Sequence, residues 1–447
     1  MTAFNRKSNK SHLSPPLFLL LGFALVIMVG TFLLNLPMSS QNGEPVGLVN
    51  AFFTASSATC VTGLTVVDTA AHWTDFGHVV IITMIQIGGL GLMTFSVLFS
   101  ILLGKSIGLS DRLIIKEQFN LDTLNGLVKL LKYVVLIAFV IEGIGSLIFA
   151  TKFIPMYGFG RGLWTSIFHG ISSFCNAGFS TIPGNIEPFK SDLLININIM
   201  LLVIFGGLGF SVIVEIFSKR KFSKLSVQAK LVLIISTALI LIGAIGFFLM
   251  ERTNMETIGG EGLYTQTLQS FFQSVVARTA GFNSVNLAGL RDSTALLLVI
   301  MMFVGGSPGS TAGGLKTTTV ATLFLATFSV IRGEKDTVVF NRKIADETIR
   351  KSLAIIVIAI SLIIMITLIL SITEDFSYID ILYETVSAYG TVGVTKGITP
   401  ELSNIGKIIL SCTMYIGRVG SLTMAFAFGR KLKLTKLSYA ETNISVG

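Results

Sequence analysis

Long apolar stretches alternate with shorter, half-polar segments along the chain. A helix needs about 20 apolar residues to cross the hydrocarbon core of a bilayer, and eight stretches are long enough. They cover residues 17–36, 78–103, 130–150, 194–217, 229–250, 294–331, 352–372 and 405–428, the sixth with an interruption. Between the members of each consecutive pair lies a segment too short to cross, at 47–59, 163–175, 264–277 and 378–388. The pattern predicts a unit of helix, half-helix and helix, repeated four times.

Each predicted half-helix leads into a short polar turn centred on one glycine. These glycines are Gly63, Gly178, Gly281 and Gly393, separated by 115, 103 and 112 residues. In each copy an aromatic residue stands ten positions before the glycine, a small polar residue two positions after it, and a second glycine cluster 24 to 28 positions after it. The aromatic residues are Phe53, Phe168, Phe271 and Tyr383, the polar ones Thr65, Ser180, Asn283 and Thr395, and the clusters begin at Gly88, Gly206, Gly305 and Gly417. Three features in register in four copies indicate internal repetition rather than similar composition.

The composition excludes a soluble globular protein. Apolar residues make up 52% of the chain, charged residues 13%, and the mean hydropathy is +0.79, whereas soluble domains carry about 25% charged residues. Most of the 33 Lys and Arg residues lie at the termini and after the second, fourth and sixth apolar stretches. By the positive-inside rule these parts face the cytoplasm and the glycine turns face outward. Topology therefore explains the net charge of +9, and no nucleic acid partner is expected.

The expected fold is an all-α polytopic membrane protein in the plasma membrane, with both termini cytoplasmic. Eight transmembrane helices and four pore half-helices would surround one pseudo-fourfold pore. The expected divisions are an N-terminus at 1–15, four repeats at 16–104, 105–218, 219–331 and 332–436, and a C-terminal tail at 437–447.

The glycine turns have the chemistry of a cation filter. An ion entering a narrow pore loses water, and backbone carbonyls can replace it where glycine permits unusual dihedral angles. The two side chains before each glycine differ between copies, which argues for carbonyl ligands, and carbonyls without carboxylates suit a monovalent cation better than calcium or magnesium. Potassium is favoured, and sodium and rubidium stay open. The expected ligands are Val61, Thr62, Gly63, Asn176, Ala177, Gly178, Thr279, Ala280, Gly281, Thr391, Val392 and Gly393.

The sixth apolar stretch is interrupted by five glycines and a proline within residues 305–316. A continuous helix would be severely strained there. Non-helical backbone at membrane depth persists only where protein or water satisfies its polar groups, so this loop should line a cavity on the cytoplasmic side of the turns. Its residues are Gly305, Gly306, Ser307, Pro308, Gly309, Ser310, Thr311, Ala312, Gly313, Gly314, Leu315 and Lys316.

The same loop nearly spells a phosphate-binding motif. The register fails by one residue, because Leu315 stands between Gly314 and Lys316, and the flanking segments are apolar spans rather than a strand and a soluble helix. We therefore set a nucleotide site aside. Lys316 could add positive charge to a closed pore or extend to the cytoplasmic surface, and both alternatives stay open.

Two arginines lie within the apolar part of the sequence. Arg418 occupies the glycine cluster of the fourth repeat, and an arginine at membrane depth is a functional-site candidate. We expect it to face the pore near the loop, either hydrogen-bonding the loop carbonyls or acting as an electrostatic barrier. Arg278 stands three residues before Gly281, where a cation facing the pore would repel potassium, so it should point behind the turn, toward Glu142 or Glu384.

The glycine turns, the Gly-rich second helices and the eight-helix plan resemble the Trk/Ktr/HKT superfamily of potassium transporters. The compact length is most similar to the membrane subunit of bacterial Ktr systems, and the resemblance covers about residues 16–436. Only the turn at 389–393 comes close to the TVGYG sequence of potassium channels. The resemblance implies an intramembrane gate at 305–316 with Arg418 beside it, and a homodimer with one pore per protomer. It also implies a separate cytoplasmic regulator, an octameric ring of Rossmann-type domains that binds ATP or ADP.

Two other classes of function compete with potassium uptake. An alternating-access transporter for another small solute would have two halves around a midplane site rather than four copies of one turn. A membrane-embedded enzyme is not expected, because the sequence offers no nucleophile, metal cluster or carboxylate pair. No covalent cofactor is expected; potassium would be the substrate, and sodium as a coupling or activating ion stays open.

Overall fold

The structure, a computed structural model, describes residues 15–91, 127–420 and 442. Several sequence predictions lie outside these residues. They are the N-terminus up to residue 14, the second half of the stretch 78–103, the start of the second repeat up to 126, and the parts of the fourth repeat and C-terminal tail at 421–441 and 443–447.

Four long apolar helices begin the four repeated segments of the chain. They are α1 (Pro15–Leu34), α7 (Leu127–Tyr157), α11 (Val227–Glu251) and α15 (Asp346–Thr373). Each is long and apolar enough to cross a membrane. Large apolar side chains such as Leu241, Ile245 and Leu249 of α11 are exposed, as expected for a helix with one face toward lipid.

Four shorter helices follow at the positions predicted for the half-helices. They are α2 (Leu48–Cys60), α8 (Phe159–Phe174), α12 (Leu263–Val276) and α16 (Tyr378–Gly390). All have between 13 and 16 residues, too few to cross a bilayer. Each ends three to five residues before its turn glycine.

The apolar helix that follows each turn ends or breaks at its glycine cluster. These helices are α4 (Asp75–Leu90), α9 (Leu193–Leu208) with α10 (Phe210–Lys219), α13 (Asp292–Phe303) with α14 (Thr317–Ile331), and α17 (Asn404–Val419). The prediction of one helix over 194–217 is wrong, because α9 and α10 meet at 97°. The break is at Gly209, whose φ of 92° and ψ of 133° favour glycine, and α4 and α17 end at Gly91 and Gly420 with similar angles.

Short elements connect the helices. Outside the membrane helices lie α3 (Thr69–His72) and the 3₁₀ turns η1 (Pro37–Ser39), η2 (Glu187–Phe189), η3 (Phe222–Lys224), η4 (Leu287–Gly289) and η5 (Thr399–Glu401). Between α14 and α15, strands β1 (Val338–Val339) and β2 (Arg342–Lys343) form an antiparallel hairpin in which Val338 pairs with Lys343.

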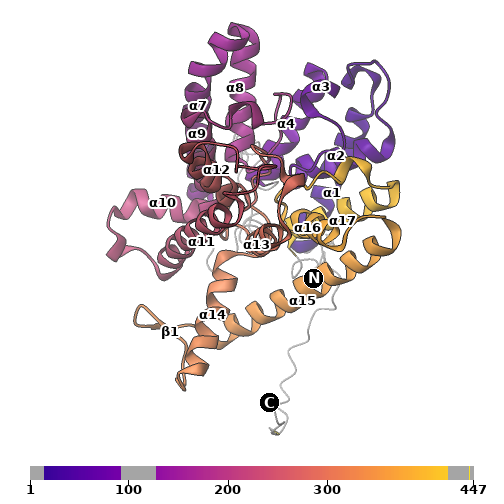
Figure 1. The fold of residues 1–447 in the computed structure, drawn as a ribbon. Coiled ribbons are helices and arrows are strands. Elements are labelled where there is room, and N and C mark those ends of the chain that lie inside the picture. Colours follow the sequence, from indigo (N-terminus) through magenta and orange to yellow (C-terminus); the bar gives the residue numbers. More distant parts are fainter. Residues whose placement is uncertain (1–14, 92–126, 421–441, 443–447) are drawn as a thin grey trace, which may run out of the picture.

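The four segments follow one another around a common centre (Figure 1). We number them in chain order: segment one contains α1 to α4, segment two α7 to α10, segment three α11 to α14 and segment four α15 to α17. The second helix of each segment contacts the half-helix of the next, in the pairs α4 with α8, α9 with α12, α13 with α16 and α17 with α2. Because the last contact returns to segment one, the arrangement is closed.

The predicted aromatic register holds in three segments and fails in the third. Phe53, Phe168 and Tyr383 are completely buried, whereas Phe271 is 37% exposed and its neighbour Phe272 is buried instead. The third turn is shorter by one residue: its Ala280 amide bonds back four residues, whereas the equivalent amides of the other turns bond back five. The aromatic that packs in the core therefore stands nine positions before Gly281.

Candidate ion pore and gate

Each half-helix ends in a turn whose backbone has the same alternating conformation. The residue two before the glycine has a positive φ, at Val61 (59°), Asn176 (62°), Thr279 (74°) and Thr391 (50°). The glycines themselves have φ of 100° (Gly63), 70° (Gly178), 68° (Gly281) and 94° (Gly393), and the residues between have negative φ. This alternation lets consecutive carbonyls point to the same side of the chain, which an ordinary strand does not permit.

The four turns meet at one point. A Cβ atom on Gly63 would lie 2.6 Å from the carbonyl oxygen of Ala177, and one on Gly178 would lie 2.7 Å from that of Ala280. A Cβ atom on Gly281 would lie 2.9 Å from the Val392 oxygen and 3.0 Å from the Thr62 oxygen, and one on Gly393 would collide with the Thr62 oxygen. Backbone carbonyls from all four turns therefore lie close together with no side chain between them at the glycines, and only glycine fits at these positions.

Serine side chains hold three of the turns. The amides of Gly63 and Gly393 donate to the hydroxyls of Ser57 and Ser387, each at 3.1 Å. Ser172 donates to the carbonyl of Phe179 at 2.8 Å. All three serines stand six residues before their glycine and are buried, a register visible in the sequence that our prediction did not use. In the third segment this position is Val275.

The glycine clusters predicted after each turn bring the second helices against the turns. Gly88 contacts the Thr59 carbonyl, Gly206 the Phe174 carbonyl and Gly417 the Tyr389 carbonyl, in each case four residues before the turn glycine. Any side chain at these helix positions would collide with the backbone. In segment three the corresponding Gly305 contacts Gly313 of its own loop instead, so the loop replaces the helix contact there.

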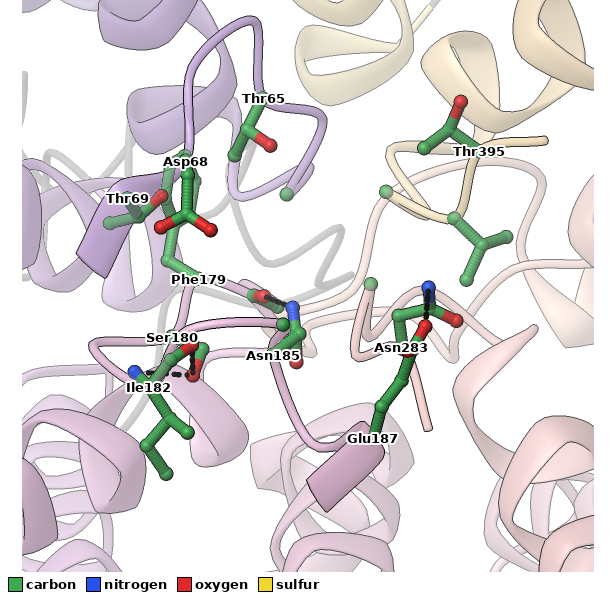
Figure 2. Close-up of a pocket in the computed structure, with 16 residues that line it drawn as sticks. Thr65, Asp68, Thr69, Phe179, Ser180, Ile182, Asn185, Glu187, Asn283 and Thr395 are labelled. Atoms are coloured by element: carbon green, nitrogen blue, oxygen red, sulfur yellow. Dashed lines mark hydrogen bonds between the residues drawn. The ribbon is translucent and has the colours of Figure 1, made fainter. Parts of the chain in front are cut away.

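A cavity of about 210 Å³ lies on one side of the four turns, lined by all four turn glycines (Figure 2). Thr65, Ser180, Asn283 and Thr395 line it too, together with Asp68 and Glu187. The Asn185 side chain donates to the Gly178 carbonyl at 3.1 Å, so one of the predicted carbonyl ligands is shared with a side chain that the sequence analysis missed.

Glu187 is one of the two carboxylates that line this cavity. It accepts a hydrogen bond from the Asn283 side chain at 3.1 Å, which connects segments two and three (Figure 2). Burial raises the pKa of Glu187, and the nearby charge of Lys190 opposes that rise. The carboxylate therefore takes up a proton at a higher pH than an exposed glutamate does.

The loop at 305–316 packs against the break in segment two. Val304 and Leu315 pair as a parallel bridge and close the loop at its base. The Ser307 and Thr311 amides donate to the carbonyls of Gly207 (3.0 Å) and Gly206 (3.1 Å). In return the Phe210 amide, freed by the helix break, donates to the Gly309 carbonyl at 2.9 Å. The bend at Gly209 thus supplies polar groups that satisfy the non-helical backbone of the loop.

The same loop reaches the turns themselves. Gly313 contacts the Thr391 side chain of the fourth turn, and a Cβ atom on Gly314 would lie 3.2 Å from the Cα of Gly390. The Thr311 hydroxyl donates to the Phe174 carbonyl, at the end of the second half-helix, at 3.2 Å. Residues 311–314 therefore lie directly against the second and fourth turns.

Two positively charged side chains donate hydrogen bonds to adjacent carbonyls of the loop. Arg418 donates to the Thr311 carbonyl and, with its other nitrogen, to Gly88 and, at 3.3 Å, to Gly89 of α4. This is the first of the two arrangements expected for Arg418. Lys316 folds back and donates to the Ala312 carbonyl at 2.9 Å. Arg418 of segment four thus bonds directly to the loop and also to α4 of segment one.

Comparison with known proteins places the chain in a family. The family model of TrkH, described as a cation transport protein, matches residues 23–438. The chain belongs to the TrkH family. Among relatives of this TrkH-family protein, Ktr system potassium uptake protein B of Bacillus subtilis is 41% identical over 434 residues, 97% of each chain. Potassium/sodium uptake protein NtpJ of Enterococcus hirae is 38% identical over 443 residues, 98% of this chain and 97% of its own.

The fold of this TrkH-family protein is similar to that of a solved structure. The crystal structure of the potassium transporter TrkH from Vibrio parahaemolyticus matches with a TM-score of 0.73 at 17% identity, covering 96% of this chain and 87% of that one. Together with the apolar helices, these matches identify a multi-pass membrane protein that transports cations and is not an enzyme.

One side-chain prediction for this TrkH-family protein is wrong. Arg278 points behind its turn, as expected, but it donates to the Ser236 hydroxyl of α11 at 3.1 Å rather than to a carboxylate. Glu142 instead accepts from Gln86 at 3.0 Å, and Glu384 accepts from Thr399. The reason is the segment order: α11 packs on α12 within segment three, whereas the two carboxylates stand in segments two and four.

Proposed function

We propose that this protein takes up potassium through a filter of backbone carbonyls. The observation that carries the proposal is the convergence of four turns with the same alternating φ pattern, each at the C-terminal end of a half-helix. Helix C-termini carry partial negative charge and favour a cation between them. The ligands would be the carbonyls of residues 61–63, 176–178, 279–281 and 391–393, and the names of the relatives point to potassium.

We propose a membrane arrangement with eight crossings around one pseudo-fourfold pore. The four long helices would each cross once, and the four broken or shortened second helices would complete the other crossings beneath the glycine clusters. Both termini would be cytoplasmic, the plasma membrane would be the location, and the repeats would divide at 16–104, 105–218, 219–331 and 332–436. The membrane potential, worth ~2.3 kcal/mol per charge per 100 mV, would then draw potassium inward.

The loop at 305–316 is proposed as the gate. Its contacts with the second and fourth turns and its bonds to Arg418 and Lys316 support a closed position against the inner side of the filter. Opening would require these bonds to exchange for water. An alternating-access mechanism for another small solute receives less support, because family membership indicates a cation and four turns meet at a single point.

Regulation and assembly are proposed by analogy with the relatives. The term "Ktr system" in the name of the Bacillus protein suggests a separate regulatory subunit, which we propose to be an octameric Rossmann-type ring that binds ATP or ADP. A homodimer with one pore per protomer is proposed on the same basis. The potassium/sodium name of the Enterococcus relative supports sodium as a second transported or activating ion.

Two measurements test the proposal: growth of a complemented bacterial strain and ion uptake by the purified protein. Expression should restore growth of a potassium-uptake-deficient strain on low potassium, and the purified protein in proteoliposomes should take up rubidium down an imposed potential. Uptake measured with and without sodium would show whether sodium activates. Failure of both growth and rubidium uptake, with the protein present in the membrane, would refute the proposal.

A further inference from the structure

We propose that the Thr311 hydroxyl and the Asn176 side chain couple the gate loop to the second selectivity turn, so that loop opening changes ion preference. The inference rests on the proposed function. It predicts that a mutation that breaks the contact between these two side chains changes both the uptake rate and the ion selectivity.

Thr311 is held by all of its polar atoms. Its amide donates to Gly206 at 3.1 Å, its carbonyl accepts from Arg418, and its hydroxyl lies 3.2 Å from the Phe174 carbonyl and 3.4 Å from Oδ1 of Asn176. The residue is completely buried. Its backbone groups bond to α9 and to Arg418, and its hydroxyl is the group that contacts the second turn.

Asn176 connects that hydroxyl to the pore. It is completely buried and has a φ of 62°, a conformation that asparagine tolerates better than most residues. Its Oδ1 faces the Thr311 hydroxyl, and its Nδ2 lies 3.4 Å from the hydroxyl oxygen of Thr279 in the third turn. Asn176 and Thr279 occupy the same position of two neighbouring turns, so one side chain connects the loop with two quarters of the filter.

Loop movement must therefore disturb the filter. If Thr311 leaves, the Phe174 carbonyl and Oδ1 of Asn176 lose the one hydroxyl donor that they share in a buried site, which is unfavourable unless the side chain or the turn rearranges. Rearrangement would move the carbonyls of residues 176–178 and change their preference for potassium. Linkage requires the reverse effect as well: ions that favour the closed geometry of the turn stabilise the closed loop.

The experiment compares Thr311→Val, which removes the hydroxyl at nearly constant shape, with Thr311→Ser, which keeps it. Rubidium uptake and its inhibition by sodium are measured in proteoliposomes. We expect Thr311→Val to raise the rate by about threefold or more, the effect of one lost hydrogen bond, and to strengthen sodium inhibition. Thr311→Ser should remain close to wild type. Thr327→Val is the matched control, since the Thr327 hydroxyl bonds only within its own exposed helix turn.

Asn176→Ala tests the contact from the filter side. It should raise the uptake rate as well as weaken selectivity, and combined with Thr311→Val its effects should be less than additive. A faster Thr311→Val with unchanged selectivity, or an Asn176→Ala variant with altered selectivity and an unchanged rate, would overturn the coupling while leaving the proposed function intact. Absence of rubidium uptake by the wild type would overturn the proposed function and the coupling with it.

Discussion

Individual residues in the four turns adopt a backbone conformation that their side chains disfavour. Val61, Thr279 and Thr391 are β-branched and have positive φ, which costs about 1–3 kcal/mol at each position. Such conformations persist only where the surroundings hold them. Here the half-helix before each turn and the serines behind three of the turns do so. These contacts therefore stabilise one backbone conformation of each turn and, with it, one orientation of the turn carbonyls.

The turn glycines should not tolerate a methyl group. Gly393→Ala would place a carbon against the Thr62 carbonyl, at a φ of 94° that alanine disfavours, so rubidium uptake should fall at least about tenfold. Gly143→Ala on α7 is the matched control, because no atom lies within 4 Å of a Cβ added there, and its uptake should match wild type. Normal uptake by Gly393→Ala would show that the turns do not form the ion path.

Helices and their breaks explain the position of the loop at 305–316, which we propose as the gate. In segments one, two and four, a glycine of the helix after the turn packs against the backbone just before that turn. In segment three the equivalent Gly305 packs against Gly313 of the loop instead. The predicted half-helices are all present, and the loop at 305–316 is non-helical as its glycines and proline indicated. The break at Gly209 was missed, because a glycine cluster in an apolar run is compatible with a continuous helix until a partner, here the loop, packs against it.

Removing the break should loosen the gate. Gly209→Ala would strain a φ of 92° and place a carbon 2.6 Å from the Pro308 carbonyl, so the loop should dock less tightly and rubidium uptake should rise by about two- to tenfold. Gly333→Ala has a comparable φ of 67° but no neighbour within 4 Å, and it controls for backbone strain alone. Equal uptake by both variants would contradict a role for this break in gating.

At the scale of the molecule, the ring of segments places a cavity over the four turns, on the side that we propose to face outward. Segments two and three are joined there by the bond between Glu187 and Asn283; the charge of Lys190 acts on this carboxylate, and Asp68 lines the same cavity. A negative carboxylate at the entrance raises the local concentration of cations. Its effect depends on its protonation.

Uptake should therefore depend on external pH. Because burial places the pKa of Glu187 above the usual glutamate value, acidification neutralises it before exposed carboxylates, and uptake at low potassium should fall over that range. Glu187→Gln should already show the reduced uptake at neutral pH, and its uptake should not fall further over the pH range in which Glu187 takes up a proton. Glu401→Gln, an exposed carboxylate in η5, should retain the wild-type profile. An unchanged profile in Glu187→Gln would exclude this carboxylate.

The sequence by itself determined the order of the helices, the membrane setting and the four turns. These follow from local properties: the length of an apolar run, and the glycines that permit positive φ. Tertiary structure decided which groups meet: Ser236 rather than a carboxylate for Arg278, Asn185 on the Gly178 carbonyl, and Thr311 beneath Asn176. Such pairs join separate segments, and their geometry depends on how helices cross and where they break. Periodicity along a single chain does not encode those angles.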